Sequence, residues 1–146
     1  MTTDSEAFDL DRAHVFHSWS AQAQITPMTV LAAQGSYVWD GDGNRLLDFS
    51  SQLVNTNIGH QQPEVIAAIV AQAEKLATIA PQHGYESRYV AAERILDRAF
   101  SGAAKVFFTN GGTEAVEHAV RMARLHTGRP KILSTYRSYH GATATS

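Results

Sequence analysis

The sequence predicts an α/β fold, and two segments carry this prediction. In the second half of the chain an apolar strand at 105–109 precedes an amphipathic helix at 113–126 and a second apolar strand at 131–135. Strand, helix and strand within about 30 residues form a βαβ unit, the building block of a parallel sheet. In the first half, residues 36–49 contain two short strands around a turn, which is typical of a β-hairpin.

The N-terminal elements are less sharply defined. Residues 1–12 are charged and predicted to be loose, and residues 14–20 are predicted to form a short helix. The stretch 25–33 is apolar but contains a proline, so we expect irregular structure there. The hairpin that follows is better specified, because aspartate, glycine and asparagine separate its strand-forming segments at 37–39 and 45–49.

Two further helices precede the βαβ unit. Pro63 opens the first, a position where its missing N–H costs nothing, and apolar residues recur at helical spacing from 66 to 77. The second is predicted at 87–100. In the helix of the βαβ unit, Glu117 and Arg121 lie one turn apart and are expected to pair.

Composition excludes several classes of protein. With 44% hydrophobic and 18% charged residues, the 146-residue chain is globular rather than disordered. Its net charge of -2 is not that of a general nucleic-acid binder. The absence of cysteine excludes disulfides, thiolate metal sites and cysteine nucleophiles. An acidic start and the lack of an apolar run near the roughly 20 residues of a membrane span lead us to expect a cytoplasmic protein without a leader or membrane contact.

No repeat or linker divides the chain. We expect an N-terminal segment with the hairpin at 1–60 and the start of a large parallel-sheet domain at 61–146. Parallel sheets are buried on both faces and need several strands, and only two are predicted here. The sequence therefore indicates the front portion of a larger α/β protein.

The turn from Asn110 to Thr113 is the sharpest chemical feature. It lies between a predicted strand and a helix N-terminus, where free N–H groups and the helix dipole favour an anion. Gly111 and Gly112 allow close approach of the backbone, and the Thr113 hydroxyl adds a donor, so the turn fits a phosphate. Glu114 is expected to point away. The turn is neither a Walker A loop nor a dinucleotide fingerprint, and a plain glycine turn with Thr113 as the N-cap remains open.

The segment after the second predicted strand is a second candidate. Tyr139 can stack on a flat ligand and His140 can hydrogen-bond to it, at the sheet edge where open α/β sheets bind ligands. A surface loop with its aromatic ring packed inward is the alternative.

Other patterns predict no metal or covalent site. His14 and His17 are expected to be an ordinary pair facing solvent, because no further ligand is recognised with them. The acidic turn at 40–44 lacks the glutamate of a calcium loop, since Ser51 occupies the twelfth position. The lysines at 75, 105 and 131 stand on a helix or at strand starts, and none has the setting of a buried Schiff-base amine.

Four blocks in the same order resemble the class III pyridoxal-phosphate-dependent aminotransferases, the omega-amino-acid transaminase group. They are the hairpin at 35–49, the segment 54–60 with the proline that follows, the strand, turn and helix at 107–124, and the loop 139–141. The likeness extends from about residue 14 to the end of the chain. Four motifs in register make it specific, although no single block is decisive.

The resemblance assigns roles in a cofactor site. It implies that Gly112 and Thr113 hold the phosphate of pyridoxal 5'-phosphate, with Gly111 beside them. Tyr139 would stack on the pyridine ring, and His140 would lie in its immediate surroundings.

The resemblance also implies a substrate pocket and a homodimer. Trp19, Leu53 and Val54 fall where members of the family line the pocket, and the 81–85 loop would reach the active site of a partner subunit. Many members have serine where this chain has Gly111, and the Thr-Asn-Gly-Gly form is similar to a subgroup that includes taurine–pyruvate aminotransferases.

The implied fold is the N-terminal part of a type I pyridoxal-phosphate-dependent transferase. The full-length parent would move an amino group from an amine or omega-amino acid to a keto acid such as pyruvate. In the family, the aspartate for the pyridine nitrogen and the Schiff-base lysine follow the stacking loop, and neither position exists here. We therefore expect the chain alone to be inactive as a transaminase, because that lysine holds the aldehyde and moves the proton.

Two other interpretations stay open. In the first, the chain is a truncated pseudoenzyme or interaction module that pairs with a complete subunit. In the second, it is a small α/β domain that binds another phosphate. Failure to bind cofactor in an ordered chain would favour the first, and binding of a nucleotide instead would favour the second.

Overall fold

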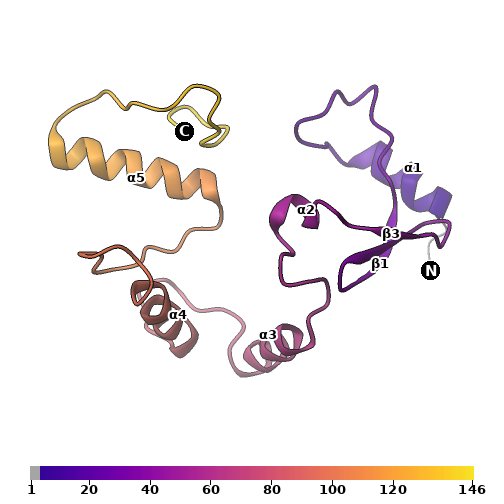
Figure 1. Ribbon diagram of the computed structural model, residues 1–146, viewed down its shortest axis with the longest axis horizontal. Coiled ribbons are helices and arrows are strands. Elements are labelled where there is room, and N and C mark those ends of the chain that lie inside the picture. The colour runs from indigo at the N-terminus through magenta and orange to yellow at the C-terminus, as the bar shows by residue number, and fades with distance from the viewer. Residues whose placement is uncertain (1–3) are drawn as a thin grey trace. The chain divides into compact units, whose positions relative to one another are not determined.

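A three-stranded antiparallel sheet forms the centre of the first half of the chain (Figure 1). The structure, a computed structural model, describes residues 4–146. The strands are β1 (Val30–Gln34), β2 (Tyr37–Asp40) and β3 (Arg45–Leu47), in the order β1-β2-β3. The predicted hairpin is confirmed as the β2–β3 pair, with Tyr37 opposite Leu47.

The turn of this hairpin is held by Asp40. Its Oδ1 accepts hydrogen bonds from the backbone N–H of Asn44 at 2.8 Å and of Asp42 at 3.1 Å, and its Oδ2 accepts one from the Asn44 amide. Gly43 has a φ of 83°, which a residue with a Cβ rarely adopts. These contacts lower the pKa of Asp40, chiefly through the Asn44 side chain.

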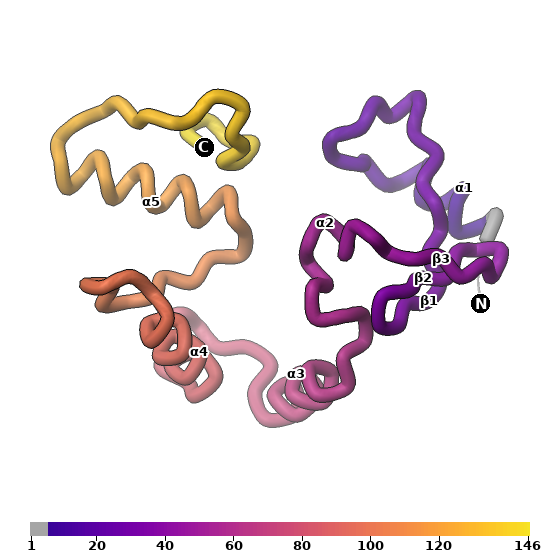
Figure 2. The backbone as a smooth tube through the Cα atoms, viewed as in Figure 1, coloured from indigo at the N-terminus to yellow at the C-terminus, as the bar shows by residue number. Residues whose placement is uncertain are grey.

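The chain is organised in two units, Met1–Ile79 and Ala80–Ser146, whose backbones are traced in Figure 2. The first contains α1 (Asp4–His14), the sheet, the short α2 (Ser51–Val54) and α3 (Pro63–Lys75). The second contains α4 (Glu86–Leu96) and α5 (Gly112–Thr127).

The N-terminal expectations were wrong. Residues 4–14 form α1 instead of a loose segment, and residues 15–20 follow it without a helix; residues 1–3 lie outside the described part of the chain. Basic side chains in the last turn of α1 complement its dipole. The stretch expected to be irregular contributes β1, because pairing with β2 supplies backbone partners that its local sequence does not reveal.

The two strands predicted at 105–109 and 131–135 are not formed as paired strands. Within residues 4–146, neither segment takes part in a sheet. A strand is stable only when its N–H and C=O groups are paired, and the described residues place no partner strand beside these two.

The predicted helices are confirmed with shifted ends. α3 begins at Pro63, and α5 ends before Gly128, whose φ of 68° is the left-handed conformation of a helix C-cap. α4 ends at Leu96, and the residues up to Phe100, expected to be helical, form turns.

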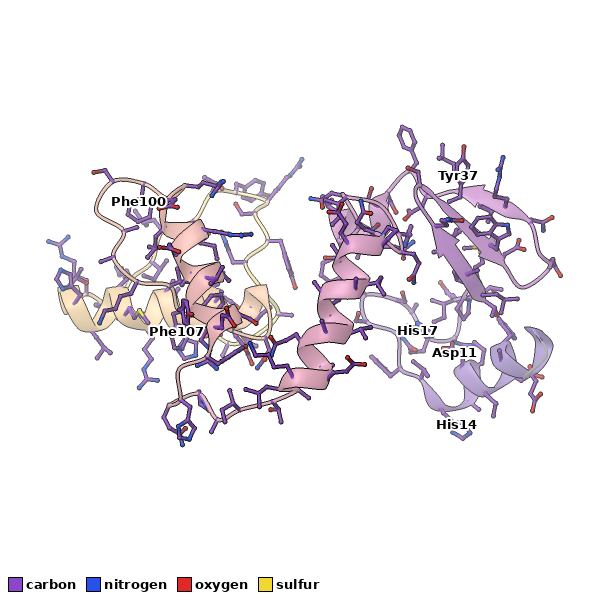
Figure 3. The ribbon with its side chains drawn as sticks, turned by 90° about the horizontal axis from the view of Figure 1, so that it is seen from below. Asp11, His14, His17, Tyr37, Phe100 and Phe107 are labelled. Carbon is purple, nitrogen blue, oxygen red and sulfur yellow. The ribbon has the colours of Figure 1, made fainter. Side chains whose placement is uncertain are left out.

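The core is small. Among the described residues, the buried hydrophobic side chains are Val38 and Val120, while Phe49 is 93% and Leu133 96% exposed. Figure 3 shows many side chains extending away from the ribbon. Isolated apolar side chains on a surface are ordinary. Such a large number of exposed large apolar side chains is typical of a surface that is covered by further protein. Across residues 4–146, no helix combines the length and apolarity needed to cross a bilayer.

Candidate functional site

The glycine turn before α5 presents backbone donors to open space. Gly111 is the N-cap, and the first hydrogen bond of the helix runs from the Ala115 N–H to the Gly111 carbonyl at 3.1 Å. The N–H groups of Gly112, Thr113 and Glu114 therefore have no acceptor within the helix. A Cβ built on Gly111 or Gly112 would meet nothing within 4 Å. The turn thus has the donors, the dipole and the space for a phosphate, as the sequence predicts.

Thr113 is not the N-cap. It lies inside the helix, and the extended Gly111 takes the cap position without a side-chain hydrogen bond. The alternative in which Thr113 serves as the cap is therefore wrong.

Glu114 does not point away from the turn. Its Oε2 accepts a hydrogen bond from the Asn110 N–H at 2.9 Å. This contact is related to a capping box but is displaced by one residue, because the carboxylate bonds to the N–H of Asn110 and not to that of the N-cap Gly111. A negative charge therefore lies on the Asn110 side of the turn, and a phosphate has to approach from the Gly112 and Thr113 side.

The C-terminal loop, residues 138–146, packs on the first turns of α5. A Cβ on Gly141 would lie 2.9 Å from Cγ2 of Thr113, so the Gly141 backbone closely approaches the Thr113 side chain. The Glu117 carboxylate accepts hydrogen bonds from the hydroxyls of Thr143 and Thr145 and, at 3.2 Å, from the Thr145 N–H. The loop that carries Tyr139 and His140 is thereby attached to the helix that carries the glycine turn.

Glu117 therefore does not form the predicted pair with Arg121. Its carboxylate instead accepts hydrogen bonds from the C-terminal loop. The hydrogen bond from Thr143 is the main cause that lowers the pKa of Glu117, because it stabilises the charged form.

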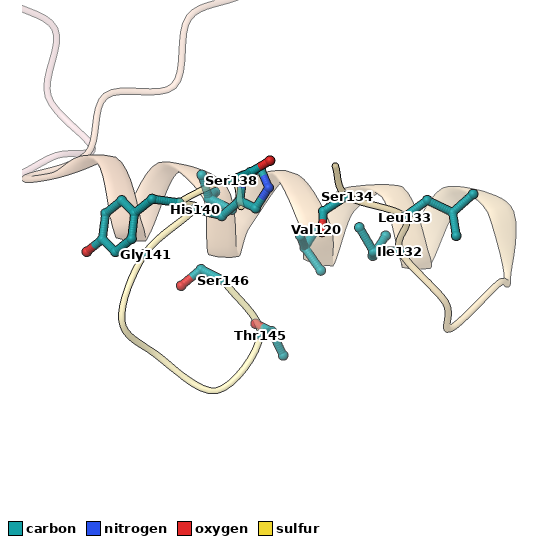
Figure 4. A pocket seen from close by; sticks show the side chains of 11 residues that line it. Val120, Ile132, Leu133, Ser134, Ser138, His140, Gly141, Thr145 and Ser146 are labelled. Atoms are coloured by element: carbon teal, nitrogen blue, oxygen red, sulfur yellow. The ribbon is translucent and has the colours of Figure 1, made fainter. Parts of the chain in front are cut away.

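Two of the hollows beside α5 contain predicted cofactor residues. The first, about 350 Å³, is lined by Tyr139, His140 and the apolar side chains of Val120 and Ile132 (Figure 4). The second, about 390 Å³, is lined by Asn110, Thr113 and Glu114, but not by Gly111 or Gly112. The structure thus places all five predicted cofactor residues in one unit, with Thr113 and the aromatic loop on separate hollows.

The predicted pocket residues lie in the other unit. Leu53 and Val54 belong to α2 and are 81% and 72% exposed, and Trp19 follows α1 and is 76% exposed. α2 is left-handed: Ser51, Gln52, Leu53 and Val54 have φ angles of 50°, 50°, 58° and 67°. For residues other than glycine this conformation costs about 1–2 kcal/mol each, so nothing in the sequence predicts it.

Sequence reasoning missed a histidine–carboxylate hydrogen bond that holds this segment. His60 Nε2 lies 2.7 Å from Asp48 Oδ2, and their side chains are only 13% and 4% exposed. The backbone of His60 also pairs with Gly35, with N···O distances of 2.7 and 3.0 Å. The residues are 12 apart and lie outside the helices and strands, so no helical or strand period links them.

This pair predicts acid sensitivity. The hydrogen bond from His60 is the main cause that lowers the pKa of Asp48. A carboxyl group with a lowered pKa in the folded state contributes stability above its unfolded pKa, and this contribution is lost as the pH falls through the folded value. We expect the Tm followed by circular dichroism to hold down to about pH 4 and then to fall.

The Asp48→Asn variant tests this expectation. It should be less stable at pH 7, and its Tm should depend less on pH below about pH 4. Asp42→Asn, which changes an exposed carboxylate on the hairpin turn, is the control and should keep the acid dependence of the unmodified chain. Equal acid dependence in all three proteins would contradict the assignment.

A second histidine–carboxylate contact lies near the N-terminus. His17 Nε2 is 2.6 Å from Asp11 Oδ2, whereas His14 is exposed, so the two histidines do not act as a pair (Figure 3). In the part of the chain that the structure describes, no group of three or more His, Cys, Asp or Glu side chains is arranged to hold a metal ion.

The three lysines are exposed. Lys75, Lys105 and Lys131 all lie at the surface, and none of them lines a hollow described beside α5. The described residues therefore supply donors for a phosphate and an aromatic ring, and no amine beside them.

Comparison with known proteins agrees with the resemblance seen in the motifs. The family model "Aminotransferase class-III" matches residues 19–146. A 4-aminobutyrate aminotransferase of Mycobacterium bovis is 41% identical over 120 residues, which are 80% of this chain and 26% of that protein. The acetylornithine aminotransferase of Methanothermobacter thermautotrophicus is 33% identical over 138 residues, 94% of this chain and 34% of the relative.

Solved structures give the same result. The taurine:2-oxoglutarate aminotransferase of Bifidobacterium kashiwanohense, in complex with PLP and glutamate, is similar with a TM-score of 0.92 and 42% identity, covering 98% of this chain and 32% of that chain. An S-selective transaminase of an Arthrobacter species has a TM-score of 0.89 and 29% identity, covering 99% and 32%. The chain spans about a third of the length of these proteins. It belongs to the class III aminotransferase family, and its fold is the N-terminal portion of that of the pyridoxal-phosphate-dependent transaminases.

Proposed function

We propose that this chain is the N-terminal portion of a pyridoxal-phosphate-dependent aminotransferase and supplies the phosphate-binding half of its cofactor site. The whole enzyme moves an amino group from an amine or omega-amino acid to a keto acid such as pyruvate. The observation that carries the proposal is the open glycine turn at the start of α5, with the Tyr139–His140 loop attached to the same helix.

The residues present fit the phosphate and the ring of this cofactor. The N–H groups of Gly112 and Thr113 would donate to phosphate oxygens, and the absent Cβ at Gly111 and Gly112 leaves room for them. Tyr139 would hold the pyridine ring by stacking, and His140 would lie in its surroundings. When bound, the cofactor supplies an aldehyde that takes up the amino group and a ring that accepts electrons from the substrate carbon.

Residues of the first unit form the proposed substrate pocket. Trp19, Leu53 and Val54 are large, exposed apolar side chains, suited to the carbon chain of an amine. The names of several relatives support a donor whose reacting amine is not on the carbon that bears the acidic group, since they specify 4-aminobutyrate, acetylornithine and taurine.

We further propose that the whole enzyme is a cytoplasmic homodimer in which the 81–85 loop reaches the active site of the partner. The organisation into an N-terminal segment at 1–60 and a cofactor domain from 61 onward belongs to the same proposal. Support comes from the exposure of large apolar side chains such as Phe49, Leu133 and Tyr136, which a larger assembly would cover.

The 146-residue chain alone should bind pyridoxal phosphate without transaminase activity. The test is titration of the chain with pyridoxal phosphate, followed by borohydride reduction and mass spectrometry of tryptic peptides. We expect saturable binding that inorganic phosphate displaces, and no single lysine labelled above the others, because the three lysines are exposed.

Pyridoxal without its phosphate is the matched control and should bind at least about tenfold more weakly, because it lacks the charged group that the turn receives. Equal binding of both compounds would contradict the phosphate site. Stoichiometric reduction onto Lys75, Lys105 or Lys131 would contradict the expected inactivity of the chain.

A further inference from the structure

The left-handed turn Ser51–Val54 needs support from outside itself. Its four residues have positive φ angles, and each carries a Cβ that this conformation brings close to the following carbonyl oxygen. The β-branched Val54, with a φ of 67°, is the least suited of the four. Leu53 and Val54 are largely exposed, so burial of their side chains does not compensate.

The support comes from both oxygens of Asp48. Oδ1 accepts hydrogen bonds from the Ser50 hydroxyl at 3.2 Å and from the Gln52 N–H at 3.4 Å, at the start of the turn. Oδ2 lies 2.7 Å from Nε2 of His60, at the far end of the segment. One carboxylate therefore joins the beginning of the turn to His60, which lies beyond residues 55–59.

The segment is also fixed to the sheet. The Asp48 N–H donates to the Ser36 carbonyl at 2.9 Å, and His60 pairs through its backbone with Gly35. Within the segment, the Val54 N–H donates to Ser50 at 3.0 Å and the Thr56 N–H to Ser51 at 3.0 Å. Residues 48–60 thus form a loop whose two ends are held on the turn between β1 and β2 and are joined by the Asp48 side chain.

We propose that Asp48 and His60 are positioning residues of the substrate pocket: their pairing holds the left-handed turn, and the turn presents Leu53 and Val54 to the amino donor. The second part rests on the proposed function. The first part concerns the chain itself and can be tested without cofactor or substrate.

The Asp48→Asn variant separates the two contacts of the carboxylate. An asparagine has a single carbonyl oxygen, so it can accept from the turn or from His60, and its NH₂ group faces the other. We expect amide hydrogen exchange at Val54 and Thr56 to accelerate by about tenfold, while exchange at Val38 in the sheet stays within about twofold.

The Asp11–His17 contact provides the matched control. It is also a carboxylate–histidine pair in the same unit, at 2.6 Å, but it lies outside the 48–60 loop. Asp11→Asn should leave exchange at Val54 and Thr56 unchanged. If Asp48→Asn also loosens the sheet, His60→Ala gives the same test, because it retains the backbone pair with Gly35.

Relief of strain should restore the turn. Gln52 is exposed and has a φ of 50°, which glycine adopts without penalty. Adding Gln52→Gly to Asp48→Asn should therefore recover most of the lost protection at Val54 and Thr56. A carboxylate that only stabilised the sheet would give no such recovery.

The exposed end of the turn can be followed directly, because the chain has no cysteine. A nitroxide attached to Leu53→Cys should show restricted motion in its electron paramagnetic resonance spectrum, and faster motion when Asp48→Asn is added. In the active enzyme, Asp48→Asn should raise KM for the amino donor by about tenfold with a smaller effect on kcat.

The outcomes separate the two proposals. Asp48-dependent protection in a protein that binds no pyridoxal phosphate would contradict only the proposed function. Rapid exchange at Val54 and Thr56 in the unmodified chain, equal effects of Asp48→Asn and Asp11→Asn, or an unchanged donor KM in an active enzyme would overturn the positioning role.

Discussion

Replacing Gly112 with aspartate should abolish the binding of pyridoxal phosphate while leaving the fold intact. A Cβ at this position meets no atom within 4 Å, and an acidic residue in the first turn of a helix is favourable to the helix itself. The new carboxylate would stand where the phosphate has to approach. Two charges about 4 Å apart near a protein surface repel by about 4 kcal/mol, so we expect the Kd to rise at least about 100-fold.

Gly112→Asn is the matched control for this variant. It has nearly the same size and shape without the charge, so it should weaken binding far less than the aspartate does. Fluorescence titration gives both Kd values, and the circular dichroism melting curve shows whether α5 is retained. Equal losses in the two variants would show that the space at Gly112 matters and the charge does not.

Replacing Gly141 with alanine should detach the aromatic loop from the start of α5. Gly141 has a φ of 143°, which side chains rarely adopt, and an added Cβ would lie 2.9 Å from Thr113 Cγ2 and 2.8 Å from Ser146 Cβ. Strain of this kind typically costs about 1–3 kcal/mol. The loop carries Tyr139 and His140, so affinity for pyridoxal phosphate should fall about tenfold along with the stability.

Gly84→Ala is the control for Gly141→Ala. Gly84 has no strained φ and nothing within 4 Å of an added Cβ, so alanine there should leave both stability and cofactor affinity unchanged. Denaturant unfolding and cofactor titration provide the two measurements. An unaltered affinity in Gly141→Ala would mean that the contact with Thr113 does not position the aromatic loop.

Local sequence was enough to predict the elements that are defined by their own capping and turn residues. The helix opened by Pro63, the helix closed by Gly128 and the hairpin turn around Asp40 were all predicted, because capping and turn preferences act over a few residues. The glycine turn with free donors at the start of α5 was predicted for the same reason, although the strand expected before it is not formed. β1 was missed because its stability comes from pairing with β2, which propensity within 25–33 does not indicate.

Contacts that depend on residues distant in the sequence were either predicted wrongly or not predicted. Glu117 and Arg121 have helical spacing, yet Glu117 bonds to the C-terminal loop, because Thr143 and Thr145 offer donors that helix periodicity leaves out of account. Glu114 turned back to Asn110 because an unpaired N–H attracts a nearby carboxylate. The strands at 105–109 and 131–135 have apolar patterns, but pairing requires neighbours that the described residues do not provide.

The sequence by itself determined the family, the glycine turn and the residue types that fit a phosphate and a flat ring, since these are properties of short motifs in a fixed order. Only the tertiary structure decided that Gly141 meets Thr113, that Asp48 joins the turn Ser51–Val54 to His60, and that four residues other than glycine adopt a left-handed conformation. The physical reason is that local preferences act along the chain. A strained turn or a shared carboxylate is stable only where contacts between distant residues outweigh those preferences.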